Sequence, residues 1–213
     1  MKRTALLTSI ILISASLWAQ SEKYTGAMKK NLAALDTAFK NPPSLLIVAN
    51  NFERIAAAEK TQWLPYYYAA FCQVNYGFIQ PDKSKSDSYA DKAAELIDKA
   101  DSLAPGNSEI SCLKSMIASC HMMVDPKTRW QQYGQESSAS LDAAISQDAA
   151  NPRPHYLRGQ GLVYTPEQFG GGCKTAKPEL QAAMDKYASF KPAGELYPDW
   201  GKEQVEALLK GCP

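Results

Sequence analysis

The chain has 213 residues, of which 45% are hydrophobic, and it carries 23 Lys and Arg against 22 Asp and Glu. This size and apolar content are sufficient for one domain with a buried core. The formal net charge of +1 gives no electrostatic reason to expect nucleic acid or an anionic membrane surface as a partner.

The N-terminus has the pattern of a secretory signal peptide. Two basic residues precede an apolar stretch from Ala5 to Trp18, which is too short for a comfortable membrane span. We expect cleavage after Ala19, within a residue or two, which removes residues 1–19 and leaves 20–213 as a single helical domain. No Cys directly follows the apolar stretch, so a lipid-attachment signal is missing. The predicted product is a periplasmic or secreted protein without stable membrane insertion.

Helical periodicity, interrupted by Pro, Gly and Asn, divides the rest of the chain. No run alternates apolar and polar residues as a strand would, so the predicted fold class is all-α. In chain order, the expected helices cover residues 23–39, 43–60, 66–77, 89–104, 108–123, 137–148, 155–164, 175–190 and 200–210. The last of these is expected to cover the exposed end of the helical stack.

Two connecting segments contain aromatic residues. Residues 127–135 are predicted to be less regular, with Trp130 and Tyr133 anchoring them to the stack. Residues 165–172 are predicted to form a loop whose three consecutive glycines let Phe169 fold back onto the stack.

One spacing occurs three times in the chain. A small residue is followed at +4 by a larger apolar residue and at +7 by Ala, and these offsets fall on one face of a helix. Such a face lets a neighbouring helix approach closely, which is typical of stacked helix pairs. The three copies are Ala93/Ile97/Ala100, Ser137/Leu141/Ala144 and Ala176/Leu180/Ala183.

Five cysteines occur in a chain that we expect to enter an oxidising compartment. Cys112 and Cys120 cannot pair, because eight residues on one helix separate their Cα atoms by roughly 12 Å. Cys173 follows a glycine run and Cys212 follows the last helix, so these two could form a disulfide. Cys72 could pair with a cysteine of the next helix or remain a buried free thiol. The redox state of the five stays open.

Several features that suggest chemistry have simpler structural interpretations. Residues 120–123, Cys-His-Met-Met, offer soft metal ligands, but adjacent helical residues point about 100° apart and cannot all reach one ion. The glycines at 170–172 lack the preceding strand and the Lys-Ser/Thr ending of a phosphate loop. His155 has no evident nucleophile or carboxylate partner nearby. We therefore expect no enzyme activity, no metal site and no cofactor.

The chain resembles the tetratricopeptide repeat family. Ala93, Ile97 and Ala100 with Pro105 match the second-helix pattern of that family, and residues of 66–77 and 155–162 match its first-helix pattern more loosely. The resemblance covers about residues 45–190 as three to four degenerate helix pairs, with periods longer than the family's 34 residues. It implies a right-handed α-solenoid whose concave groove is lined by the first helix of each pair.

Transferring the family's groove positions gives a largely aromatic surface with few charges. Such a surface favours an extended peptide, a protein helix or an apolar small ligand. The alternative is that loops or the first helix fill the groove and make these residues core. The implied groove residues are Tyr67, Phe71, Asn75, Glu109, Cys112, Met116, Cys120, Arg153, Tyr156, Gln160 and Tyr164.

Two functions follow from these expectations. The main prediction is a non-catalytic periplasmic scaffold that binds a protein or peptide of the cell envelope through the groove. The alternative is a periplasmic small-ligand carrier associated with a transport system, with a closed pocket near Tyr67, Tyr156 and Tyr164. Residues 165–172 are similar to a loop in exported bacterial repeat proteins, including periplasmic components associated with organic-acid transporters. This likeness supports a periplasmic helical-repeat relative and a transport association, and no ligand is carried over from it. The identity of the partner and the oligomeric state stay open.

Overall fold

The structure is a computed structural model that describes residues 22–212, so the predicted signal peptide lies outside the described residues. Every regular element in the described range is helical, which confirms the predicted all-α class. The elements are a first helix (residues 22–38), α2 (Pro43–Ala58), α3 (Trp63–Ile79), α4 (Ser86–Leu103), α5 (Ser108–Met122), α6 (Pro126–Gln147), α7 (Arg153–Tyr164), α8 (Cys173–Tyr187) and α9 (Lys202–Gly211), with 3₁₀ turns η1 (Lys83–Lys85) and η2 (Glu167–Phe169).

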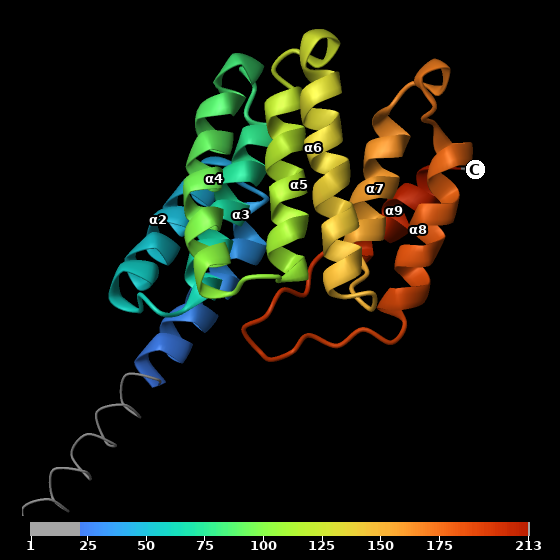
Figure 1. The fold of residues 1–213 in the computed structure, drawn as a ribbon. Helices are drawn as coiled ribbons and strands as arrows, with labels where there is room; N and C mark the ends of the chain where they lie inside the picture. The colour runs from blue at the N-terminus through green and yellow to red at the C-terminus, as the bar shows by residue number, and fades with distance from the viewer. Residues whose placement is uncertain (1–21, 213) are drawn as a thin grey trace, which may run out of the picture.

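Successive helices run in alternating directions and lie side by side, as Figure 1 shows for α4 to α8. The connections α5–α6 and α7–α8 lie at one end of the bundle, which we call the open end. At the opposite end, an irregular segment of residues 188–201 runs beneath α7, α6 and α5 and returns to α9. We call this segment the strap. Within residues 22–212, no helix is long and apolar enough to cross a membrane.

The core is divided between two groups of buried side chains. The larger group lies among the helices from the first to α5, and the smaller group lies among α7, α8 and α9. Between them, α6 buries only Leu141 and Ala144. The middle of the molecule therefore depends on polar contacts and on the strap to hold its two halves together.

The repeated small–large–Ala spacing marks the packing faces of α4, α6 and α8. All members of the three copies are buried except Ser137, which is half-buried and shares hydrogen bonds with Ser115 and Ser119 of α5. Close approach also shapes the α7–α8 pair, because a Cβ atom built on Gly159 would lie 2.6 Å from Cδ2 of Leu180. A larger residue at position 159 would push these two helices apart.

The prediction that residues 127–135 are irregular is wrong, because α6 is continuous from Pro126 to Gln147. Pro126 stands at the start of the helix, where its missing N–H costs nothing. The first turns carry no apolar stripe, and for that reason periodicity failed to reveal them. Polar contacts stabilise them instead: Arg129 donates to both carboxylate oxygens of Asp87, at 2.7 and 2.9 Å.

A disulfide joins Cys173, at the start of α8, to Cys212, just after α9, with their Cα atoms 5.2 Å apart. These are the two cysteines that the sequence analysis considered as a pair. Cys72, Cys112 and Cys120 are buried free thiols. The bridge closes α8, the strap and α9 into one covalent loop, with 39 positions of sequence separation between the two cysteines.

Replacing both bridged cysteines by serine is expected to lower the free energy of unfolding by about 2–4 kcal/mol, since the open chain gains conformational entropy when unfolded. Urea denaturation followed by circular dichroism measures the change. The reduced wild-type protein should show the same loss, because the buried thiols contribute no second bridge. An unchanged denaturation midpoint in the double variant would show that the bridge does not stabilise the fold.

Candidate functional site

Trp200 of the strap covers much of the groove that the sequence analysis inferred. Its Nε1 donates to the hydroxyl of Tyr67 at 2.9 Å, and its ring lies 5.1 Å from that of Phe71 and 6.1 Å from that of Tyr156. Tyr67 is 0% exposed, and the other two aromatic residues are also buried. These side chains are therefore core in the described structure, which is the filled-groove alternative of the sequence analysis.

Arg153, another residue of the inferred groove, is the most deeply buried charge in the described part of the chain. Its side chain is 0% exposed and lies between the rings of Phe190 and Trp200, 4.8 and 5.1 Å from their centroids. Nη1 donates to Glu109 at 2.8 Å, and Nη2 donates to the carbonyl of Pro198 at 2.7 Å. Arg153 thus ties α7 to α5 and to the strap.

The remaining residues of the inferred groove differ in how deeply they are buried. Cys112, Met116 and Cys120 are buried on α5, and burial raises the pKa of the Cys120 thiol to about 12. Asn75 is half-buried and donates to the carbonyl of Phe71. Gln160 is also half-buried and donates to the hydroxyl of Tyr156. The only inferred groove residue that is largely exposed is Tyr164.

Three large aromatic side chains are exposed at the open end of the bundle. Trp130 in the first turns of α6, Tyr164 at the end of α7 and Phe169 in η2 are 64%, 75% and 73% exposed. We call these three residues the aromatic rim. They come from neighbouring elements, and Figure 1 shows α6 and α7 drawing apart toward this end. Three exposed large aromatic side chains at one end of a bundle make that end a candidate binding surface.

The expectation that Trp130 packs onto the stack is wrong, and the geometry of α6 gives the reason. Arg129 and Tyr133 are four residues apart and share the helix face that meets α4 and α5, where Tyr133 stacks on His121 with the ring centroids 5.0 Å apart. Trp130 lies about 100° around the helix from Arg129 and therefore points away from this contact.

The expectation that Phe169 folds back onto the stack is also wrong. Backbone hydrogen bonds close its loop without the ring: the N–H of Gly171 donates to Pro166, and that of Gly172 donates to Leu162. Gly170 and Gly172 adopt positive φ values of 85° and 90°, which permit this tight path. The loop needs no apolar anchor, so the ring stays in solvent.

Both histidines are engaged with carboxylates. His121 Nδ1 lies 2.8 Å from Asp87, and its side chain is 14% exposed. His155 Nδ1 lies 2.7 Å from Glu179, a partner that the sequence analysis did not find. The side chains of His155 and Glu179 are 18% and 26% exposed. The pair therefore lacks the enclosed surroundings of an acid–base centre.

No group of three or more His, Cys, Asp or Glu within the described residues is arranged to hold a metal ion. The Cys120 sulfur contacts the carbonyl of Ser86, at 3.8 Å.

A hollow of about 590 Å³ lies between the first helix and α2. Lys23, Tyr24, Arg54 and Ile55 are among its lining residues. The Tyr24 hydroxyl is buried without a hydrogen-bond partner, and burial raises its pKa to about 12. This hollow is a second surface of the right scale for a small organic ligand.

Comparisons with protein-family models and with curated proteins give no match, so the tetratricopeptide resemblance rests on the short residue patterns alone. Among solved structures, the chain is similar to the HusA haemophore from Porphyromonas gingivalis, with a TM-score of 0.80 and 39% sequence identity over 89% of this chain and 92% of that chain.

Proposed function

The chain belongs to the family of the HusA haemophore, and from this premise we propose that it is an exported protein that binds haem and carries it as cargo. The observation that carries the proposal is a similarity that extends over 89% of this chain at 39% identity. Haem is here the transported ligand and takes no part in a reaction. The proposed role is binding rather than catalysis.

This proposal corrects the main prediction from sequence. A scaffold that binds a protein or peptide in its groove is wrong, because the similar solved protein is a haemophore and because Trp200 occupies the groove. The alternative prediction, an exported carrier of a small ligand, agrees better with the comparison.

The aromatic rim suits the chemistry of haem, a flat and mainly apolar macrocycle. Aromatic side chains stack on such rings and gain dispersion energy together with apolar burial. Three such side chains are exposed and do not pack in the core, namely Trp130, Tyr164 and Phe169. We therefore place the cargo between the ends of α6 and α7.

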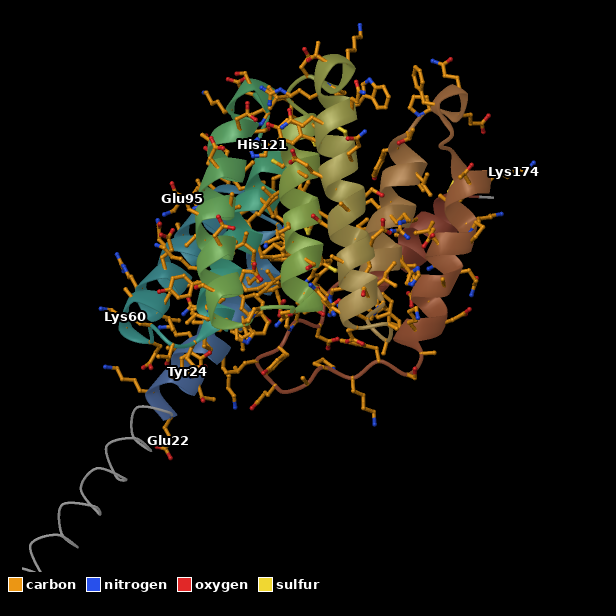
Figure 2. All side chains as sticks on the ribbon, viewed as in Figure 1. Glu22, Tyr24, Lys60, Glu95, His121 and Lys174 are labelled. Atoms are coloured by element: carbon orange, nitrogen blue, oxygen red, sulfur yellow. A yellow bond between two sulfur atoms is a disulfide. The ribbon has the colours of Figure 1, made fainter. Side chains whose placement is uncertain are left out.

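Two exposed amines at the open end could pair with the two carboxylates of haem. Lys127 in the first turn of α6 and Lys174 in the first turn of α8 are both exposed. Figure 2 shows Lys174 and His121 toward this end of the bundle, whereas Tyr24 and Lys60 lie toward the other. The two ammonium groups could pair with the carboxylates at the polar edge of the macrocycle.

Haem titration of the mature protein tests the proposal. Binding should be saturable and should quench tryptophan fluorescence. Truncating Trp130, Tyr164 or Phe169 to Ala is expected to cost about 1–2 kcal/mol each, which corresponds to roughly a tenfold weaker affinity. The triple variant should bind at least a hundredfold more weakly, as measured from the haem absorbance change.

Ile47→Ala is the matched control, because Ile47 is 63% exposed on α2 and does not belong to the rim. This variant should bind haem like the wild type. Absence of saturable haem binding by the wild-type protein would overturn the function itself. If the triple variant bound normally while Tyr24→Ala weakened binding, the function would stand and the cargo site would be the hollow beside the first helix.

Export and organisation of the chain are part of the same proposal. We propose that residues 1–19 direct secretion to the periplasm or beyond. Residues 20–213 act as one domain of degenerate TPR-like helix pairs. This domain has neither nucleic acid nor a membrane as its partner. Determining the N-terminal residue of the exported protein tests the cleavage site. A retained Met1 would contradict it.

A further inference from the structure

The first turns of α6, residues 126–136, carry Trp130 of the aromatic rim but contribute nothing to the core. None of these residues is buried, and the only buried residues of α6 are Leu141 and Ala144, further along the helix. Apolar burial therefore does not fix how these turns lie against the bundle. The position of Trp130 depends on polar contacts instead.

Arg129 attaches the first turns of α6 to α4 and α5. Its Nη1 donates to both carboxylate oxygens of Asp87, at 2.7 and 2.9 Å, and to the carbonyl of His121, at 3.1 Å. His121 Nδ1 lies 2.8 Å from the same carboxylate, and its ring stacks on that of Tyr133 with the centroids 5.0 Å apart. Figure 2 shows His121 toward the open end. We call these four residues the polar clamp.

The charges of the polar clamp complement one another. The guanidinium of Arg129, and to a smaller extent His121, lowers the pKa of the Asp87 carboxyl below its usual range. This carboxylate therefore stays ionised at neutral pH and continues to accept hydrogen bonds from α6. An isolated ion pair with this exposure contributes little, whereas several charges in one network can hold a defined geometry.

The polar clamp also sets the direction of Trp130. Adjacent residues of a helix point about 100° apart, so Arg129 lies in the clamp while the neighbouring indole is 64% exposed. Rotation or fraying of the first turns would move this indole relative to Tyr164 and Phe169, which belong to other elements. We propose that the polar clamp positions Trp130 for haem, with Arg129 as the positioning residue. This role rests on the proposed haem function.

A double-mutant cycle between Arg129→Met and Trp130→Ala, measured by haem titration, tests the proposal. Arg129→Met should weaken haem binding by about threefold to tenfold, because it cannot cost more through the indole than removal of the indole itself. In the Trp130→Ala background the same substitution should change the affinity by less than about twofold. An equal loss in both backgrounds would overturn the proposal.

Asp87→Ala distinguishes positioning from direct attraction of haem. This substitution removes an anion from the polar clamp, whereas Arg129→Met removes a cation. If the guanidinium attracted the haem carboxylates directly, the two variants would change the affinity in opposite directions. Positioning requires both variants to weaken haem binding. Tighter binding by Asp87→Ala would therefore contradict the role of the polar clamp.

Arg158→Met is the matched control, because its guanidinium pairs with Asp142 of α6 at 2.6 Å, beyond the first turns. This variant should bind haem like the wild type. Hydrogen exchange without haem supplies a second measurement: both clamp variants should exchange faster in residues 126–136. Unchanged exchange, or normal haem binding by Arg129→Met, would overturn the positioning role alone. A wild-type protein that binds no haem would overturn the haem function and this role with it.

Discussion

Replacing Arg153 by Met is expected to lower the free energy of unfolding by about 3–5 kcal/mol, because it removes one partner of a buried ion pair. Glu109 would keep its carboxylate in the interior without the guanidinium, and the carbonyl of Pro198 would lose its donor. The ring faces of Phe190 and Trp200 would also lose the cation between them. Chemical denaturation of the purified variant measures the loss.

Arg158→Met supplies the matched control on the same helix. Arg158 pairs with Asp142 and Glu179, but its side chain is 26% exposed, and that of Asp142 is 68% exposed. Exposed pairs of this kind contribute about 0–1 kcal/mol. Equal destabilisation by the two substitutions would contradict the role assigned to Arg153.

Combining Arg153→Met with Glu109→Gln tests the cause of the loss. The double variant no longer leaves a buried charge unpaired, so it should be more stable than Arg153→Met alone. An additive loss would show that packing of the arginine stem, rather than the unpaired carboxylate, dominates.

Local sequence signals were sufficient for most of the helices. The side chain of Asn107 accepts a hydrogen bond from the N–H of Glu109 at the start of α5, and α4 ends just before Pro105 and Gly106. Breakers of this kind act within a few residues, so they can be read directly from the sequence. Periodicity did not predict the start of α6, because its contacts are polar and distant in sequence, as between Arg129 and Asp87, 42 residues earlier.

The covering of the groove depends on contacts that no local pattern reveals. Helical periodicity predicted Trp200 at the start of the last helix, but this residue lies in the strap, against Tyr67, 133 residues earlier in the chain. Of the aromatic rim, Tyr164 was selected as a binding residue, but from its assumed place in the groove. Trp130 and Phe169 were predicted to pack onto the stack, and both are exposed instead.

Replacing Trp200 by Ala is expected to destabilise the protein by about 3 kcal/mol, as truncation of a large aromatic residue in a packed cluster does. The variant would lose the hydrogen bond to Tyr67 and the ring contacts with Phe71 and Tyr156. Faster hydrogen exchange confined to the strap and the ends of α3 and α7 should accompany the loss, because this side chain joins the three elements.

Trp200→Phe distinguishes the hydrogen bond from the packing. This variant keeps an aromatic ring against Phe71 and loses only the donor to Tyr67, so a loss of about 1–2 kcal/mol is expected. Haem affinity should be unchanged in both variants, since Trp200 lies at the strap end and the aromatic rim lies at the open end. The opposite outcome is a loss of haem affinity in these variants that parallels the faster hydrogen exchange of the strap. That outcome would place the cargo in the groove over Tyr67, Phe71 and Tyr156 and would remove the role assigned to the aromatic rim.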